Sequence, residues 1–207
     1  MDNTVTTQSA DEKQDMEIQG AGAKRNMEME TGAPYRHSLT LPSLVTLAAA
    51  ILVVVAFFLP LATANAEYTE YLKKYAEELN VPEIKMTNED AIHISMYEFA
   101  KTYWACYDLI DKTLAMVVTA VIGAAGIFSL ITLLVALFKK PVAVIIFNVF
   151  TLGAYYLTIW DFKDRGVMPN SNYDWGIAYY LYYIGIVVVF AGAVWLLAAK
   201  IKQRRRG

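Results

Sequence analysis

Asn148 is the most polar side chain deep in the apolar segments of this sequence, and three polar residues follow it at helical spacing. Thr151, Tyr155 and Thr158 recur at intervals of three or four, so a helix would carry all four residues on one face. Such a face can line a pore or bond a neighbouring helix. Ion and proton pathways usually need ionisable groups at depth, and the apolar segments contain none. A helix contact is therefore the preferred interpretation.

The other candidates for chemistry are scattered carboxylates and one histidine. His93 lies between Glu89 and Glu98, but a metal site needs several ligands at matched spacing, and this grouping is typical of a solvated helix face. Further acids follow the third apolar segment: Asp161, Asp164 and Asp174. The sequence has no His-Glu-x-x-His motif, Gly-rich phosphate loop or nucleophile elbow. We therefore expect no enzyme, no metal and no cofactor.

Four segments that contain no Lys, Arg, Asp, Glu or His form the framework that positions the polar and acidic residues named above. They cover residues 44–64, 114–138, 142–160 and 177–199. At about 1.5 Å per residue, each helix could cross a hydrocarbon core of about 30 Å. Peptide groups find no water in that core, so each segment is expected to be a helix. The sequence predicts an all-α membrane protein, a bundle of four transmembrane helices.

The expected layout alternates these spans with polar segments. Spans are predicted at 39–66, 112–138, 141–160 and 175–199, with a disordered cytoplasmic tail at 1–38 and a basic cytoplasmic tail at 200–207. An extracytoplasmic helical hairpin is expected at 67–111 and a short extracytoplasmic loop at 161–174.

The hairpin prediction rests on amphipathic spacing. Residues 67–80 place apolar side chains on one face of a helix, which should pack against a second helix; they are Tyr68, Tyr71, Leu72, Tyr75 and Leu79. Thr87 and Asp90 resemble a capping signal for that second helix. Neither Gly nor Pro occurs between Thr87 and Gly123, so one helix is expected to continue directly into the second span.

Basic residues indicate the orientation. Arg36, the pair Lys139 and Lys140, and the C-terminal tail fall on one side of a four-span chain, and the acidic segments fall on the other. Since Lys and Arg mark the cytoplasmic side, both termini should be cytoplasmic. The single cysteine, Cys106, excludes an intramolecular disulfide and favours a bacterial plasma membrane. Cleavage after Ala66 as a signal peptide is the alternative to an uncleaved first span.

Small residues predict where spans touch. One set repeats every seven residues in the last span: Ala178, Gly185, Gly192 and Ala199. A second set, in the second span, repeats every four: Ala115, Thr119 and Gly123. Small side chains allow helices to approach closely, so these sets predict packing seams within the bundle, with a homodimer face as the alternative. A final set of cations should contact lipid headgroups: Lys200, Lys202, Arg204, Arg205 and Arg206.

These features favour a non-enzymatic interaction or scaffold protein that uses its extracytoplasmic hairpin to bind a protein partner. The alternative is a subunit of a multi-chain transporter or channel that uses the polar face of the third span. The C-terminal basic run is short and adjoins a span, so nucleic-acid binding is not expected.

Overall fold

The computed structural model describes residues 40–205, and the predicted tail at 1–38 and Arg206 lie outside the described residues. The chain divides into two compact units after Leu41. The strands and long helices described below belong to the second unit, Pro42–Gly207.

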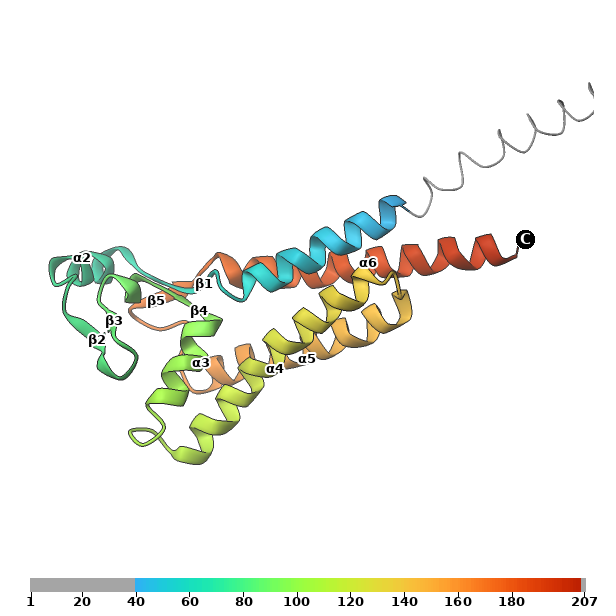
Figure 1. Cartoon of the computed structure of the whole chain (residues 1–207). Coiled ribbons are helices and arrows are strands. Elements are labelled where there is room, and N and C mark those ends of the chain that lie inside the picture. The colour runs from blue at the N-terminus through green and yellow to red at the C-terminus, as the bar shows by residue number, and fades with distance from the viewer. Residues whose placement is uncertain (1–39, 206–207) are drawn as a thin grey trace, which may run out of the picture. The chain divides into compact units, whose positions relative to one another are not determined.

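Three long helices dominate this unit: α4 (Lys112–Leu137), α5 (Pro141–Asp164) and α6 (Ile177–Arg204). Each is long and apolar enough to cross a membrane. Asp111 caps α4 by accepting a hydrogen bond from the Leu114 amide at 2.8 Å, and Pro141 opens α5 at a position where its missing N–H is not needed. The helices run side by side (Figure 1), as expected for a multi-pass helical membrane protein.

The first apolar segment is only partly helical, so the prediction of a single helix over 44–64 is wrong. The first helix runs Thr40–Ala56 and is shorter than the three long helices. Strand β1 follows at Pro60–Ala64. Pro60 explains the change, because proline lacks an N–H and its ring clashes with the carbonyl four residues earlier, here that of Ala56.

The segment predicted as a helical hairpin folds instead as an α/β structure. Its helices are α2 (Ala66–Lys74) and α3 (Met96–Ala105), and its strands are β2 (Leu79–Val81), β3 (Met86–Thr87) and β4 (His93–Ser95). Two short 3₁₀ turns, η1 (Pro82–Ile84) and η2 (Asp90–Ile92), separate the strands. β1 pairs antiparallel with β4 on one side and with β5 (Tyr173–Trp175) on the other, while β2 pairs with β3. We call residues 60–111 and 165–176 the α/β unit.

Two caps explain why no continuous helix runs from Thr87 into the second span. Thr87 and Asp90 do exchange hydrogen bonds, but they close only the short turn η2. The helix that follows starts at a full capping box, in which Ser95 and Glu98 bond each other's backbone amides. α3 then ends at Ala105, and α4 begins after its own cap at Asp111.

The predicted loop at 161–174 is shorter than expected and contributes a strand. α5 continues to Asp164, and Gly166 turns the chain with a φ of 66°. The Asn170 side chain then accepts hydrogen bonds from the amides of Asn172 and Tyr173. This turn directs β5 to the edge of β1, so the two polar segments form one sheet.

The larger of two hydrophobic clusters runs from the long helices into the three-stranded sheet. Fully buried side chains of the sheet region, Leu61 and Met96, belong to the same cluster as Phe162 at the end of α5 and Ile122 in the middle of α4. The α/β unit is therefore packed onto the helices rather than joined to them by a linker.

Candidate functional site: a tyrosine row on the α/β unit

Four tyrosine rings form a continuous series that we call the tyrosine row: Tyr173, Tyr68, Tyr71 and Tyr75. Ring centroids lie 5.4 Å apart for Tyr173 and Tyr68, 5.9 Å for Tyr68 and Tyr71, and 5.3 Å for Tyr71 and Tyr75. These separations fall in the range that favours aromatic pairs. Tyr71 is 56% exposed and Tyr75 36% exposed, so the row ends in two accessible rings.

The sequence predicts that this face of α2 is buried against a second helix, and that prediction is wrong. Among the apolar residues of α2 only Leu72 is buried, in a small cluster with Met86 and Ile92. Strands and 3₁₀ turns, instead of a helix, cover the Leu72 side. Tyr71 and Tyr75 therefore remain accessible. The sequence indicated the row only through the spacing of Tyr68, Tyr71 and Tyr75, which places them on one face of a helix.

Both polar segments of the chain hold the row in place. Asn65 caps α2 by accepting a hydrogen bond from the Tyr68 amide at 2.9 Å. Its own backbone N–H donates to the Asn172 carbonyl at 2.9 Å, and its Nδ2 donates to the Ser171 carbonyl at 2.6 Å. The Tyr173 hydroxyl donates to the Ala91 carbonyl at 2.8 Å. Burial raises the pKa of Tyr173 to about 12, which keeps this donor protonated.

Exposed residues of both charges share α2 with the rings. α2 carries Glu67, Glu70, Lys73 and Lys74, and the Lys74 Nζ lies 5.4 Å from the centroid of the Tyr75 ring. At that distance a cation interacts favourably with a ring face. Lys74 therefore places a positive charge at the exposed end of the tyrosine row.

The predicted polar face of the third span lies against α6. Asn148 is 2% exposed, and its Nδ2 donates to the Ile186 carbonyl at 3.0 Å. The Asn148 Oδ1, the Tyr182 hydroxyl and the Thr119 hydroxyl are buried without a partner among the described residues. A polar group left in this state costs about 1–3 kcal/mol.

The rest of that face is also buried. Thr151 and Thr158 donate to carbonyls one turn back in α5, and the Tyr155 hydroxyl donates to the Tyr179 carbonyl at 3.1 Å. The Tyr155 ring stacks on Tyr182 of α6 with centroids 4.3 Å apart. This geometry gives the four polar residues contacts within and between helices. Their participation in a transport path stays a prediction.

The scattered acids and the histidine are not brought together as a metal site. Glu98 accepts hydrogen bonds from the backbone and side chain of Ser95, and His93 is exposed on β4. Asp164 and Asp174 are exposed. Within residues 40–205, no group of three His, Cys, Asp or Glu side chains could hold a metal ion.

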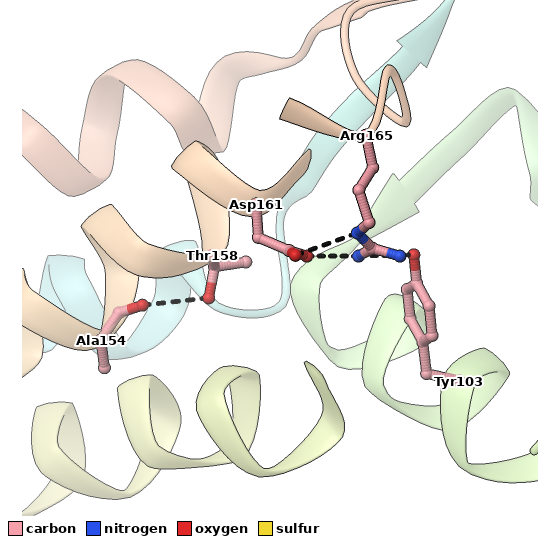
Figure 2. A network of polar contacts seen from close by, with 5 residues as sticks. All are labelled: Tyr103, Ala154, Thr158, Asp161 and Arg165. Atoms are coloured by element: carbon pink, nitrogen blue, oxygen red, sulfur yellow. Dashed lines mark hydrogen bonds and ion pairs between the residues drawn. The ribbon is translucent and has the colours of Figure 1, made fainter. Parts of the chain in front are cut away.

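Asp161, in the last turn of α5, is paired with Arg165, the residue that follows the helix. The guanidinium bonds both oxygens of the carboxylate, at 2.9 Å from Nε to Oδ1, and its Nη2 also donates to the Tyr103 hydroxyl at 3.2 Å. Figure 2 shows this chain of contacts from α5 to Tyr103 on α3, with the Thr158 hydroxyl bonded to the Ala154 carbonyl at its left. Such a bidentate pair is strong and directional. Asp161 and Arg165 therefore tie α5 to the α/β unit.

The small residues of the last span meet the first helix. A Cβ added to Gly185 would lie 2.6 Å from Val53 Cγ2, and one added to Gly192 would lie 2.5 Å from Thr46 Oγ1. Ala178 is fully buried and Ala199 partly buried. The chain's own first helix thus occupies the middle of this seam, and a homodimer through it would require that helix to leave.

The second predicted seam is less consistent. Ala115 is fully buried and Thr119 partly buried in α4. A Cβ added to Gly123 would meet no atom within 4 Å, so no helix approaches closely there.

Cys106 follows α3 and is buried as a free thiol. Burial and, secondarily, the nearby Glu83 carboxylate raise the pKa of this thiol above its ordinary value. Because the thiolate is the reactive form, Cys106 is a small packing residue and a poor nucleophile.

Comparison with protein-family models, with curated proteins and with solved structures finds no match to this chain.

Proposed function

We propose that this protein crosses the plasma membrane four times, with both termini in the cytoplasm, and that its α/β unit faces the exterior and binds a partner protein through the tyrosine row. The role is one of interaction or scaffolding without catalysis. The observation that carries this proposal is the pair of exposed rings of Tyr71 and Tyr75 on a firmly anchored helix.

The first helix supports a fourth crossing. Its 17 residues would extend about 25 Å at ~1.5 Å per residue, close to the thickness of the hydrocarbon core. One side packs on α6 at Gly185 and Gly192. Beyond Thr40 at the start of the helix, the opposite side exposes apolar residues, among them Leu44, Ile51 and Val55, as a lipid-facing surface does.

Charge distribution supports the orientation. Every Asp and Glu in residues 40–205 lies in the α/β unit or at the adjoining ends of α5 and β5. At the opposite end of the long helices, residues 40–205 place cations and no Asp or Glu. These cations are Lys139, Lys140, Lys200, Lys202, Arg204 and Arg205. Since Lys and Arg remain on the cytoplasmic side, the α/β unit is external.

Composition and rigidity support a protein-binding role for the tyrosine row. Tyrosine is enriched at binding surfaces because it buries a large ring at low entropic cost and keeps a polar group at its tip. Lys74 beside the Tyr75 ring supplies a charge at the edge of the row, as the polar rim of such contacts does. α2 also lies at the end of the α/β unit farthest from the long helices (Figure 1), where a partner would meet no lipid.

Photocrosslinking tests this proposal. The photoreactive amino acid p-benzoylphenylalanine replaces Tyr71, which is 56% exposed, or Tyr156, which is 58% exposed on α5. Both variants keep an aromatic ring of similar accessibility, but only the first lies on the α/β unit. In native membranes the Tyr71 variant should yield a discrete protein adduct that the Tyr156 variant lacks. A Tyr71 variant that remains a single uncrosslinked chain would refute the proposal.

A further inference from the structure

A groove separates the start of α5 from the end of α6, at the end of the helices remote from the α/β unit. Its volume is about 430 Å³. The walls combine apolar side chains with three cations: Val142, Ile146, Leu197, Ile201, Lys140, Lys200 and Arg204. This volume falls within the range typical of small-molecule sites.

Among residues 40–205, no Asp or Glu lies at this end of the long helices, so none of them neutralises the three cations. The sequence contains no Asp or Glu between Lys112 and Asp161, and none after Asp174. The first helix has no charged residue either. Asp161 is the first acid along α5, about 30 Å from Pro141 at ~1.5 Å per residue. No carboxylate of residues 40–205 therefore offsets the positive charge of the groove.

Lys200 is held at the edge of this groove. Its Nζ donates a hydrogen bond to the backbone carbonyl of Lys139 in the turn between α4 and α5. Lys140 and Arg204 are exposed beside it. Three positive groups thus converge on one short stretch of surface.

The backbone adds to this charge. The residue before α5, Lys140, makes no side-chain cap, and the first helical residue is proline. The amides of Val142 and Ala143, which also line the groove, belong to the first turn, whose N–H groups have no acceptor within the helix. These amides and the helix dipole favour an anion at the same place as the cations.

We propose that this groove binds one anionic phospholipid, with its phosphate between Lys140, Lys200 and Arg204 and an acyl chain along Val142, Ile146 and Ile201. A soluble anion would leave the apolar wall uncovered, and a neutral lipid would leave three cations without a counter-charge. An anionic phospholipid would both cover the apolar wall and supply a counter-charge to the cations. The site is independent of the tyrosine row and needs only that α5 and α6 cross the bilayer.

Native mass spectrometry of the purified full chain tests the site. The protein is supplied with phosphatidylglycerol or phosphatidylcholine, and the lipid retained on each chain is counted. The groove variant replaces Lys140, Lys200 and Arg204 with Gln. The control variant replaces Lys139, Lys202 and Arg205 with Gln, which removes the same charge from the same end without touching the groove.

The wild type and the control should each retain one phosphatidylglycerol in preference to phosphatidylcholine. The groove variant should bind phosphatidylglycerol at least about tenfold more weakly, since each cation near a headgroup contributes about 1 kcal/mol. If both variants lost phosphatidylglycerol equally, the binding would come from diffuse surface charge and the proposed site would be wrong. The site would also be wrong if neither variant lost phosphatidylglycerol.

Two further measurements keep the result decisive. Lys140→Gln with Arg204→Gln alters only exposed side chains, and it should weaken binding even if the triple variant folds poorly. Glycerol phosphate is then added as a soluble competitor without acyl chains. It should not displace phosphatidylglycerol at comparable concentration. Full displacement would show a simple anion site and contradict the lipid assignment.

Discussion

Tyr173 joins the two polar segments of the chain through one hydrogen bond and one ring contact. Its hydroxyl donates to Ala91, and its ring meets Tyr68 at the base of the tyrosine row. This partly buried hydroxyl must stay protonated to keep its bond to the carbonyl. The stability of the α/β unit should therefore depend on pH in the alkaline range.

We expect Tyr173→Phe to lower the free energy of unfolding by about 1 kcal/mol, the usual contribution of one hydrogen bond. The pKa of Tyr173 rises from an ordinary value of 10.0 to about 12 on folding. The wild-type stabilisation is thus complete below pH 10 and declines as pH rises from 10 towards 12, and Tyr173→Phe should lack this decline. Denaturant unfolding in nanodiscs at pH 8 and pH 11 measures both effects.

The matched control is Tyr71→Phe, which removes a hydroxyl from an exposed ring of the same row. It should change stability by less than about 0.5 kcal/mol at pH 8. Equal effects of the two substitutions would contradict the role given to the Tyr173 bond.

Gly192 sets the distance between α6 and the first helix. We expect Gly192→Ala to destabilise the protein by about 1–3 kcal/mol, because the added methyl group meets both the hydroxyl and the Cα of Thr46. Gly153→Ala in α5 is the control, since its added Cβ meets nothing within 4 Å and alanine favours helix by up to about 1 kcal/mol. Thermal unfolding should shift in opposite directions for the two variants, and parallel shifts would argue against the close approach.

At the scale of elements, α5 connects membrane packing with the α/β unit. Its middle bonds α6 through Asn148, and its end holds Arg165 against Tyr103. A substitution at Asn148 also distinguishes the two hypotheses for the function, partner binding and transport.

We expect Asn148→Leu to change the free energy of unfolding by less than about 1 kcal/mol. The lost hydrogen bond, worth about 0.6 kcal/mol on average between membrane helices, is offset because the unpartnered Oδ1 is also removed. The photocrosslink from position 71 to a partner protein should persist, because the substitution lies in the core of the helices and away from the tyrosine row. The transporter alternative instead predicts lost flux in a chain that still assembles. Photocrosslinking and flux, measured on the same membranes, decide between the two hypotheses. Lost flux with an unchanged photocrosslink would favour the transporter.

The long helices were predictable from sequence, and the sheet was not. Uncharged runs of this length have one stable conformation in a bilayer, so α4, α5 and α6 follow from composition. The strands β1, β4 and β5 have only 5, 3 and 3 residues, and β5 pairs with β1 across more than a hundred residues of chain. Strands this short carry no reliable periodicity, and pairing at that separation leaves no local signal.

Two local signals were nevertheless present in the sequence. Pro60 ends the first helix, and Ser95 with Glu98 forms the spacing of a capping box. Both contradict a long helix at those places. The tyrosine row was visible as spacing, but its exposure depended on which element covered Leu72, which only the tertiary fold decides.

At the scale of the whole molecule, charge separates the two ends of the unit formed by Pro42–Gly207. Within residues 40–205, acids gather in and beside the α/β unit, and cations without a neighbouring acid gather around the groove between α5 and α6. This polarity fits a chain that binds a protein on one side of a membrane and an anionic lipid on the other.

The location of three engineered cysteines tests this arrangement most directly. In a Cys106→Ser background, single cysteines replace Ser9, Ser171 or Gln203, and intact cells are treated with a membrane-impermeant maleimide. The account predicts that Ser171→Cys is labelled in intact cells, and that Ser9→Cys and Gln203→Cys are labelled only after permeabilisation. Labelling of Ser9→Cys in intact cells would show that the first helix does not cross, and labelling of Gln203→Cys would contradict the orientation.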